Sequence, residues 1–329
     1  MMKLHRPRPE KDFDISVIIV NYNTWDHLDK CLESLYKYHP DCKLQVIVVD
    51  NNSTVERSHD FSAKYSGVSL HVSDTNLGFA AANNLALSLC HSENILYLNP
   101  DVIFVENVFP ILIDTLNIHK RVGAVCCKAT DLFGSVQKLP LQNFPSPWIE
   151  LLKILFYSNR TSSLFRFSHL FHSPETSGYL SYVHGHFLLM KKKLAEEIGG
   201  FDSRFFMYSE DIDLCNNIKN LGYCIYYDSN LQIIHVGSGS LSANNLHFKI
   251  NTFHNSRYRL ISKHLGKAQS KLYALFMFFG SLYRTLLISF ALPLLPFSGT
   301  SFRKMIFSSI SKYIRLLRWS MHAILTEIG

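Results

Sequence analysis

Three carboxylates lie within four residues of the segment FFMYSEDIDLC, which runs from residue 205 to residue 215: Glu210, Asp211 and Asp213. Such acids can accept a proton from a hydroxyl group, or they can complement the dipole at the start of a helix. The segment predicts a helix with Ser209 as its N-cap. On a helix, positions 211 and 213 point about 200° apart, so the three acids cannot all serve one site. Glu210 and Asp211 are the candidate pair, and Asp213 is expected to be a bystander on another helix face.

Polar side chains also gather where four successive strand-like runs end. In open α/β sheets, ligands bind beyond the carboxyl ends of the strands. For any one Asn or Asp, a simple turn is the more common explanation. Four consecutive strands that end in this way favour a binding site instead. The residues are Asn21 and Asn23, then Asp50, Asn51 and Asn52, then Asp74 and Asn76, then Asn99 and Asp101.

The loop after the first run, NYNTWD, contains no glycine. Neither a G-x-G-x-x-G fingerprint nor a Walker A loop is therefore present at this position. A bound diphosphate would lack a glycine-rich cradle here and would need a metal ion, which directs attention to Asp101.

The elements that must position these residues alternate between strand-like and helix-like patterns over the first 130 residues. This alternation predicts an α/β fold with a mostly parallel, doubly wound sheet. The stretch 133–178 is irregular, and a strand that leads into a helix follows at 178–202. The predicted strands are 15–23, 44–53, 69–76, 94–101, 123–132, 224–230 and 231–240, and the predicted helices of the first part are 25–38, 78–90 and 107–118.

The charge of the chain is unevenly distributed. All but one of its 26 acidic residues precede position 229, and the net charge is +7. Seven cysteines without a C-x-x-C pair are typical of buried thiols in a reducing compartment. The basic start has no apolar segment behind it, so no signal peptide is predicted. A near-neutral body with a cationic end favours an anionic partner, either a membrane surface or a nucleic acid.

Six motifs, in order, carry a resemblance to a known family: VIIVNYN, VIVVDNNS, NLGFAAANN, LNPD, GGFDSRFFMYSEDIDLC and HVGSGS. Over residues 13–240 the chain resembles the family 2 inverting glycosyltransferases of the GT-A fold. Within them it is most similar to the rhamnosyltransferase branch of bacterial surface-polysaccharide biosynthesis. The resemblance implies a nucleotide-diphosphate sugar as donor and a divalent cation, Mg²⁺ or Mn²⁺, as cofactor.

The resemblance also implies roles for individual residues. Asp211 would be the catalytic base and Glu210 its support. Asp101 matches the last acid of the family's D-x-D metal motif, whose first acid is replaced by Asn99. The cation would then depend on Asp101 and on His235.

Further positions follow from the same comparison. Asp50 would read the base and ribose of the nucleotide, and Gly185 and His186 would line the acceptor pocket. Two residues depart from the family pattern: His186 stands where a small residue is usual, and Asn217 stands where Arg is frequent. The remaining residues implied in the nucleotide-sugar site are Asn21, Asn23, Asn76, Gly78, Asn83 and Asn99.

Two segments of the basic end are apolar or amphipathic. Residues 272–297 carry a single charge, Arg284, and can be a monotopic element, a true membrane span or a buried hairpin. Residues 302–325 place basic side chains opposite an apolar face at 302, 306, 310, 313, 317, 321 and 324, the pattern of an interfacial helix on anionic lipid. The predicted organisation is a GT-A catalytic domain at 13–245 and a membrane-associating region at 246–329.

The expected function is inverting transfer of rhamnose from dTDP-rhamnose to a lipid-linked saccharide, as in O-antigen synthesis. The expected location is the cytoplasmic face of the bacterial inner membrane, with peripheral or monotopic attachment and no nucleic-acid partner. The same chemistry with a UDP-hexose or furanose nucleotide is an alternative, as is a nucleotide-sugar-binding protein without turnover. A nucleotidyltransferase is disfavoured because NYNTWD is not a glycine-rich basic loop.

Overall fold

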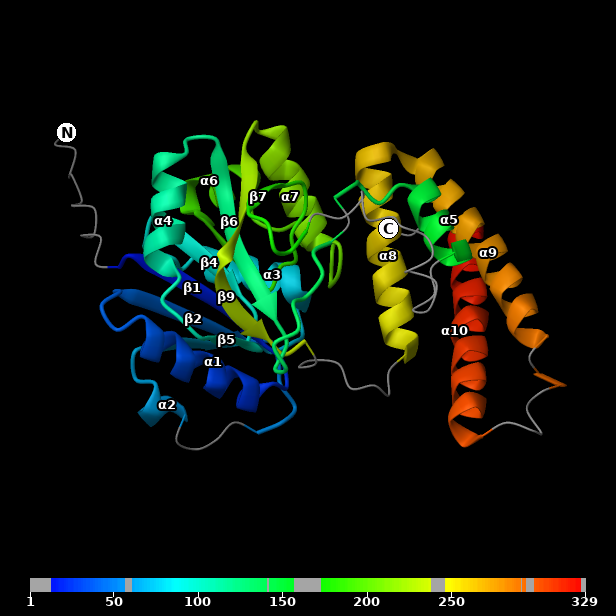
Figure 1. Ribbon diagram of the computed structural model, residues 1–329, viewed down its shortest axis with the longest axis horizontal. Coiled ribbons are helices and arrows are strands. Elements are labelled where there is room, and N and C mark those ends of the chain that lie inside the picture. The colour runs from blue at the N-terminus through cyan, green and yellow to red at the C-terminus, as the bar shows by residue number, and fades with distance from the viewer. Residues whose placement is uncertain are drawn as a thin grey trace. The chain divides into compact units, whose positions relative to one another are not determined.

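A nine-stranded mixed sheet forms the largest part of the chain (Figure 1). The computed structural model describes residues 13–56, 61–140, 142–156, 173–237, 246–290, 292–293 and 299–326. Along the sheet the strands follow the order β3-β2-β1-β4-β8-β6-β9-β5, and β7 pairs with β9. The predicted α/β class is therefore confirmed.

The first half of the sheet is parallel, as the sequence predicts. It contains β3 (Val68–Val72), β2 (Leu44–Asp50), β1 (Ile15–Asn21) and β4 (Asn94–Leu98). All seven residues of β1 are buried, which explains its continuous apolar run. The register pairs Asn21 with Asp50, so the polar ends of β1 and β2 lie side by side.

The second half of the sheet is mixed. Strand β8 (Phe187–Lys191) runs antiparallel to both β4 and β6 (Val122–Thr130), and β5 (Val102–Phe104) and β7 (Gly178–Leu180) run antiparallel to β9. The sequence predicts two strands, 224–230 and 231–240, but a single strand, β9 (Cys224–His235), runs through both, and residues 238–240 lie outside the described residues. Where the two predicted strands meet, β9 forms a bulge, because Cys127 pairs with Asp228 whereas Lys128 pairs with Gln232.

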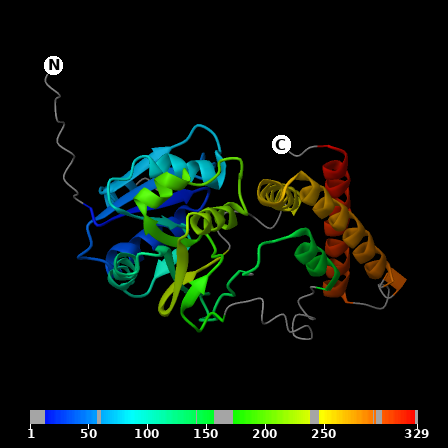
Figure 2. The same ribbon diagram turned by 90° about the horizontal axis from the view of Figure 1, so that it is seen from above.

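Helices cover both faces of the sheet (Figure 2). Helix α1 (Trp25–Tyr38) and helix α4 (Phe109–Ile118) lie on one face, where His39 stacks on Phe109 with ring centroids 3.9 Å apart. Helix α3 (Gly78–Leu87) lies on the other face. This change of face is expected because the order of the strands reverses between β3 and β4 while each crossover stays right-handed. The remaining helices of the sheet region are α2 (Phe61–Lys64), α6 (Lys192–Ile198) and α7 (Glu210–Asn220).

The contacts group the chain into two compact units. The first, the α/β unit, contains residues 1–139, 173–203 and 214–240; the second, the helical unit, contains residues 140–172, 204–213 and 241–329. The acidic turn at the start of α7 thus belongs to the helical unit, together with most of the C-terminal region. That residues 246–329 form a domain separate from 13–245 stays a prediction.

Four helices form the framework of the helical unit: α5 (Pro147–Phe156), α8 (Leu246–Leu265), α9 (Lys267–Ser289) and α10 (Thr300–Leu325). Helices α9 and α10 lie side by side (orange and red in Figure 1). Their shared core includes Tyr273, Met277, Leu316 and Trp319. Helix α5 was not expected, because it lies in the stretch that the sequence describes as irregular.

Part of the predicted lipid-facing stripe of α10 lies inside the helical unit. Ile306 is only 6% exposed, and Ile324 packs against the shared core. These two positions of the stripe thus serve helix packing, and contact of α10 with lipid stays a prediction. Within the described residues, α9 is the one helix long and apolar enough to cross a membrane.

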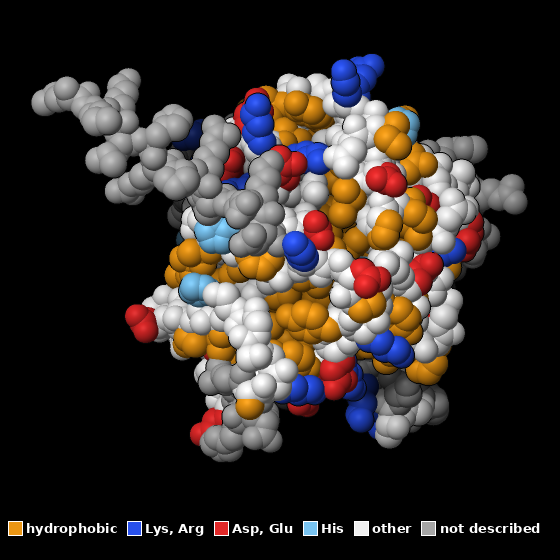
Figure 3. Space-filling view, turned by 90° about the vertical axis from the view of Figure 1, so that its left-hand side faces the viewer, with side chains coloured by type: hydrophobic (Ala, Val, Ile, Leu, Met, Phe, Trp, Pro, Cys, Tyr) orange, Lys and Arg blue, Asp and Glu red, His pale blue; other side chains and the backbone are white. Residues whose placement is uncertain are grey.

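The surface of the molecule is mixed in charge on the face that lies at the left of Figure 1. There Asp and Glu side chains lie among Lys and Arg side chains, with apolar groups between them (Figure 3). This face lies over the α/β unit and fits the near-neutral body that the sequence predicts.

Candidate active site

The ends of β1 and β2 form a network around Asp50, which is 6% exposed. The Asn21 amide donates to Asp50 Oδ1 (3.2 Å), and Ser53 Oγ donates to the same oxygen (2.5 Å). Thr24 in turn donates to Asn21 Oδ1 at 2.7 Å. Both bonds end on Oδ1. The other carboxylate oxygen of Asp50, Oδ2, accepts no hydrogen bond from a described residue. This carboxylate can therefore accept hydrogen bonds from a ligand hydroxyl or base.

Asn23 shapes the loop beyond β2. Its backbone adopts a left-handed conformation (φ 57°), and its Oδ1 accepts from Thr54 N at 2.7 Å and from Val55 N at 3.0 Å. Both bonds tie the loop after β1 to the loop after β2. Asn23 thus holds the rim of the strand ends, and its contact with a nucleotide stays a prediction.

Asn51 connects the next pair of strand ends and was not assigned a role from the sequence. Its amide donates to Asn76 Oδ1 (3.0 Å) and to Gly78 O (3.1 Å), and its Oδ1 accepts from Leu77 N (2.8 Å). Gly78 opens α3 with φ 79°, a conformation that favours glycine. The side chain of Asn51 thus links two predicted site residues, Asn76 and Gly78, through its hydrogen bonds.

Asn83 lies one turn further along α3 and is 1% exposed. Its amide donates to Phe79 O of the same helix at 2.9 Å. The side chain is therefore used within the helix, and its predicted contact with the donor stays a prediction.

Asp101 and His235 meet at the ends of β4 and β9. His235 Nε2 lies 3.4 Å from Asp101 Oδ1, and Gly237 N donates to Asp101 Oδ2 at 3.0 Å. Burial would raise the pKa of Asp101, but His235 and the Gly237 N–H outweigh it, and the pKa is lowered. Asp101 is thus an ionised carboxylate held by its neighbours.

Gln137 decides which nitrogen of His235 carries a proton. Its amide nitrogen donates to His235 O at 2.6 Å, so its Oε1 must accept from His235 Nδ1, 2.9 Å away. The other ring nitrogen, Nε2, faces Asp101 Oδ1 at 3.4 Å. Nothing in the sequence marks Gln137, since it lies in the irregular stretch after β6.

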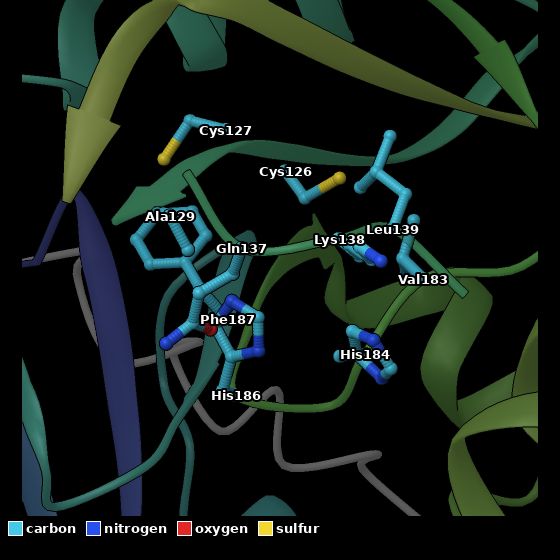
Figure 4. A pocket seen from close by; sticks show the side chains of 10 residues that line it. All are labelled: Cys126, Cys127, Ala129, Gln137, Lys138, Leu139, Val183, His184, His186 and Phe187. Atoms are coloured by element: carbon cyan, nitrogen blue, oxygen red, sulfur yellow. The ribbon is translucent and has the colours of Figure 1, made fainter. Parts of the chain in front are cut away.

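His186 completes this cluster. Its ring stacks on His235 with centroids 4.3 Å apart, and its carbonyl accepts from Asn99 N at 2.9 Å. Removal from water, with His235 beside it, lowers the pKa of His186 well below its ordinary value, so the ring is neutral. A cavity of about 20 Å³ lies alongside; its lining includes Gln137 and His186, whose side chains lie close together, and His184, which lies further away (Figure 4). Gly185 lies in the turn between the two histidines.

The residues of this cluster fit a divalent cation. Asp101 Oδ1 and His235 Nε2 lie 3.4 Å apart. This distance approaches the spacing of about 3 Å between neighbouring ligands of an octahedral ion with bonds of about 2.1 Å. Asn99 adds a buried Oδ1 that has no hydrogen-bond partner among the described residues. Carboxylate, imidazole and amide oxygen suit Mn²⁺ or Mg²⁺. In the part of the chain that the structure describes, however, no three His, Cys, Asp or Glu side chains group around one point.

The acidic turn begins with two residues in left-handed conformation, Tyr208 (φ 70°) and Ser209 (φ 65°). Ser209 occupies the N-cap position that the sequence predicts, but its side chain does not cap the helix. Its carbonyl accepts from Asp213 N at 2.9 Å, but its buried Oγ has no partner among the described residues. A side-chain cap needs an extended backbone, which the positive φ prevents.

Glu210 and Asp211 lie in different environments. Glu210 is 7% exposed, and its Oε2 has no hydrogen-bond partner among the described residues. Burial, together with the adjacent charge of Asp211, raises the pKa of Glu210 well above its ordinary value. Asp211 is half-buried, and its Oδ1 accepts from Ile212 N at 2.8 Å. The accessible acid is thus the one that the resemblance assigns as base.

Asp213 is not the bystander that the sequence predicts. It is fully buried, and it accepts from Lys263 Nζ (2.9 Å) and bonds to His264 Nε2 (2.7 Å). Both partners lie on α8, about 50 residues away in sequence, and no local pattern could have indicated them. The third acid therefore anchors the turn to α8.

Together, the sheet and its polar strand ends define a GT-A glycosyltransferase, and comparison with known proteins identifies the family. Residues 16–199 match the family model described as glycosyl transferase family 2. The chain belongs to this family, as its motifs predict.

Similar proteins point to one branch of the family. The chain is 27% identical over 236 residues to N-acetylglucosaminyl-diphospho-decaprenol L-rhamnosyltransferase of Mycobacterium tuberculosis, covering 67% of this chain and 75% of that one. It is 25% identical over 232 residues to rhamnosyltransferase WbbL of Escherichia coli, covering 67% of this chain and 83% of that one. The protein is therefore a rhamnosyltransferase-like glycosyltransferase of polysaccharide biosynthesis.

A solved structure supports the fold alone. The mannosyltransferase PcManGT of Pyrobaculum calidifontis, in complex with GDP-Man and Mn²⁺, matches with a TM-score of 0.54 at 16% identity. The match covers 98% of this chain and 91% of that one. A GT-A neighbour thus binds a nucleotide sugar together with a divalent cation.

Proposed function

We propose that the protein transfers rhamnose from dTDP-rhamnose to a lipid-linked saccharide, with inversion at the anomeric carbon. The observation that carries the proposal is the division of the acidic turn into a buried Glu210 and a half-exposed Asp211. An acid pair with unlike environments is the usual arrangement for general acid–base catalysis. The sugar and the acceptor class come from the names of the two relatives.

In this mechanism Asp211 accepts the proton of the acceptor hydroxyl. The hydroxyl oxygen attacks the anomeric carbon while the bond from that carbon to the diphosphate oxygen breaks, so one displacement inverts the centre. Glu210 supports the base, because a second adjacent carboxylate raises the proton affinity of the pair. That Asp211 and the strand ends of the α/β unit serve one reaction is part of the proposal.

The strand ends would bind the nucleotide. Asp50 Oδ2 can accept from the ribose or the base, and the rigid Asn51 network presents the backbone around Gly78 to the sugar nucleotide. A divalent cation would be held by Asp101, His235 and the Oδ1 of Asn99. When bound there, it would supply positive charge that stabilises the departing diphosphate.

A donor screen tests the proposal. Purified protein is incubated with membrane-extracted acceptor and dTDP-rhamnose, a UDP-hexose or a furanose nucleotide, and the released nucleoside diphosphate is measured. We expect release from dTDP-rhamnose, and Asp211→Asn should lower kcat by about 10²–10⁴-fold while donor binding stays intact. Release from another donor alone would contradict the assigned sugar. Equal turnover in Asp211→Asn would contradict the assigned base, and no turnover with any donor would favour the binding-protein alternative.

We also propose that the helical unit attaches the enzyme to the cytoplasmic face of the bacterial inner membrane. One stripe of α9 supports this: Phe279 and Leu286 are each 56% exposed, and Phe290 is 80% exposed. On α5, Trp148 is 60% exposed. The one charge of this part of α9, Arg284, donates from Nε to Ile154 O at 2.6 Å, which satisfies it in part within the unit. Exposed apolar side chains, with the exposed cations Lys304, Lys312 and Arg318 of α10 and no acid between 229 and 326, suit an anionic bilayer.

Sedimentation with liposomes tests this attachment. The protein should sediment with anionic liposomes, and the double variant Phe279→Ser/Leu286→Ser should sediment less. The matched control is Ile118→Ser, which removes a 71% exposed apolar side chain from α4 of the α/β unit. Preference for an oligonucleotide over liposomes would contradict the membrane assignment.

A further inference from the structure

Two residues that are not proposed ligands of the cation hold the imidazole of His235 in place, and all three belong to the α/β unit. Gln137 bonds to His235 twice: its amide nitrogen donates to His235 O at 2.6 Å, and its Oε1 lies 2.9 Å from Nδ1. His186 stacks on the face of the same ring, with centroids 4.3 Å apart and an angle of 12° between the ring planes. The side chains of Gln137 and His186 lie close together (Figure 4). The ring of His235 is therefore held both at its edge and on its face.

A tight turn after β6 brings Gln137 to the end of β9. Asp131 Oδ1 accepts from two backbone N–H groups of the turn, each at 2.8 Å. The chain then runs back beside β6, where Gln137 N donates to Ala129 O at 2.8 Å. Ala129 pairs with Ile233, two residues before His235. Because the backbone places Gln137, a substitution of its side chain should leave this turn intact.

The chemistry of the amide group assigns a proton to the ring. A carbonyl oxygen can only accept, so the end of Gln137 that faces His235 O must be the NH₂ group. The amide oxygen then faces Nδ1, which must carry a proton. A histidine binds a metal through a nitrogen without a proton, so the tautomer decides which nitrogen is the ligand. Here that nitrogen is Nε2, which lies 3.4 Å from Asp101 Oδ1.

His186 is also connected to Asn99, the third proposed ligand of the cation. The carbonyl of His186 accepts from Asn99 N at 2.9 Å. The side-chain Oδ1 of Asn99 is buried without a hydrogen-bond partner among the described residues. A buried amide oxygen without a partner costs free energy, which a ligand can restore. One residue thus contacts the ring of one proposed ligand and the backbone of another.

We propose that Gln137 and His186 are positioning residues of the cation site. Gln137 fixes Nε2 of His235 as the metal ligand, and His186 holds the plane of the ring. That Asp101, His235 and Asn99 hold a divalent cation is taken from the proposed function. Neither positioning residue touches the cation, and both act through His235. Outer partners of metal-binding histidines typically contribute about 10–100-fold to metal affinity.

Nitrogen NMR of ¹⁵N-histidine-labelled full-length protein tests the tautomer without metal or substrate. Spectra at about pH 9, above the ordinary pKa of histidine, distinguish Nδ1–H from Nε2–H rings. The signals of His235 are assigned by their loss in His235→Gln. We expect the proton on Nδ1 in the wild type and its partial or complete transfer to Nε2 in Gln137→Leu. A wild-type ring with the proton on Nε2 would overturn the role of Gln137, and so would an unchanged tautomer in Gln137→Leu. The wild-type spectrum decides the point even if this variant does not fold.

Binding of Mn²⁺ alone, followed by electron paramagnetic resonance of the free ion, tests the effect on the cation. Gln137→Leu should weaken binding by about 10–100-fold. The matched control is Gln45→Leu. Gln45 also donates to a backbone carbonyl, Leu89 O at 2.9 Å, but it lies at the start of β2, away from the strand ends, so binding should not change. Equal affinity in Gln137→Leu and the wild type, or no binding by the wild type, would overturn the proposal.

Two variants of His186 test the stacked ring by the same measurement. His186→Ala removes the ring and should weaken Mn²⁺ binding by less than Gln137→Leu does, because both hydrogen bonds to His235 remain. His186→Phe restores an aromatic ring, and the cavity of about 20 Å³ alongside can take part of the added volume. It should therefore bind Mn²⁺ more tightly than His186→Ala. Equal affinities in these two variants would refute the role of stacking.

Turnover separates the positioning role from the assigned function. With dTDP-rhamnose, Gln137→Leu should raise the Mn²⁺ concentration that gives half-maximal release of dTDP, and saturating Mn²⁺ should restore most of kcat. A lower kcat with an unchanged half-maximal concentration would contradict a role that acts through the cation. Wild-type protein that binds Mn²⁺ but releases no dTDP would refute the assigned donor, and the tautomer and the Mn²⁺ affinities would still decide the roles of Gln137 and His186.

Discussion

The strand ends of the α/β unit and the acidic turn of the helical unit hold their polar side chains in contrasting ways. At the strand ends, neutral amides and hydroxyls satisfy one another: Asn51 alone makes three hydrogen bonds. At the acidic turn, Asp213 is a buried charge whose cationic partner, Lys263, lies on α8. A neutral hydrogen bond contributes about 1 kcal/mol, whereas breaking a buried ion pair costs about 3–5 kcal/mol. The turn should therefore depend far more strongly on single residues.

The largest effect that the comparison predicts is that of Asp213→Asn. The substitution leaves Lys263 and His264 facing a neutral group in a buried position, so the free energy of unfolding should fall by about 3 kcal/mol. Urea denaturation followed by circular dichroism measures it. The matched control is Glu196→Gln, which removes the more exposed, acidic member of the ion pair between Glu196 and Lys192. Similar midpoints for the two variants would remove the contrast between the two regions.

The next effect is expected at the strand ends, from Asn51→Ala. The variant loses both donations to Asn76 and Gly78 and the acceptor for Leu77 N, which together should cost about 2 kcal/mol. Donor binding, measured by calorimetry with dTDP, should weaken as the loop around Gly78 loosens. Asn117→Ala, at an exposed position where Asn117 accepts from Lys191, is the control and should change neither quantity. Unchanged dTDP binding in Asn51→Ala would separate this network from the nucleotide site.

The same contrast explains which parts of the site the sequence predicts. The strand ends are local: Asn21 and Asp50 are the last residues of β1 and β2, and Asn76 and Gly78 lie between the end of β3 and the start of α3. Asn51 also occupies such a position and could have been assigned. Lys263 and His264 are about 50 residues from Asp213, so only the tertiary fold pairs them. The N-cap position of Ser209 was predicted, but the lack of a side-chain cap was not, because a positive φ is not visible in the sequence. Single-strand β9 was missed because its bulge contains turn-forming residues.

A smaller effect should appear as pH dependence in the helical unit. Burial lowers the pKa of His254 from about 6.5 to about 3, and its Nδ1 lies 2.5 Å from Tyr273 Oη. A lowered folded-state pKa means that the unfolded chain binds the proton first, so stability is lost as pH falls below about 6.5. Between pH 7 and pH 5.5 the wild type should lose about 1 kcal/mol more than His254→Gln. Paired urea titrations at both pH values measure the difference, and parallel losses in the two proteins would contradict a buried neutral imidazole.

The smallest effect should be that of Glu196→Gln on α6. Glu196 lies 3.3 Å from Lys192 at i,i+4 spacing, but its side chain is 56% exposed, so water screens the pair. Lys192 also keeps its bond to Cys90 O at 2.7 Å when the acid is removed. The free energy of unfolding should therefore fall by only about 0.3 kcal/mol, and less still in 1 M salt. Asp213→Asn should lose its larger amount at both salt concentrations, because the charge it removes is buried. A loss in Glu196→Gln as large as that in Asp213→Asn would mean that burial does not separate the two acids, and that the acidic turn is held no more firmly than an ordinary surface pair.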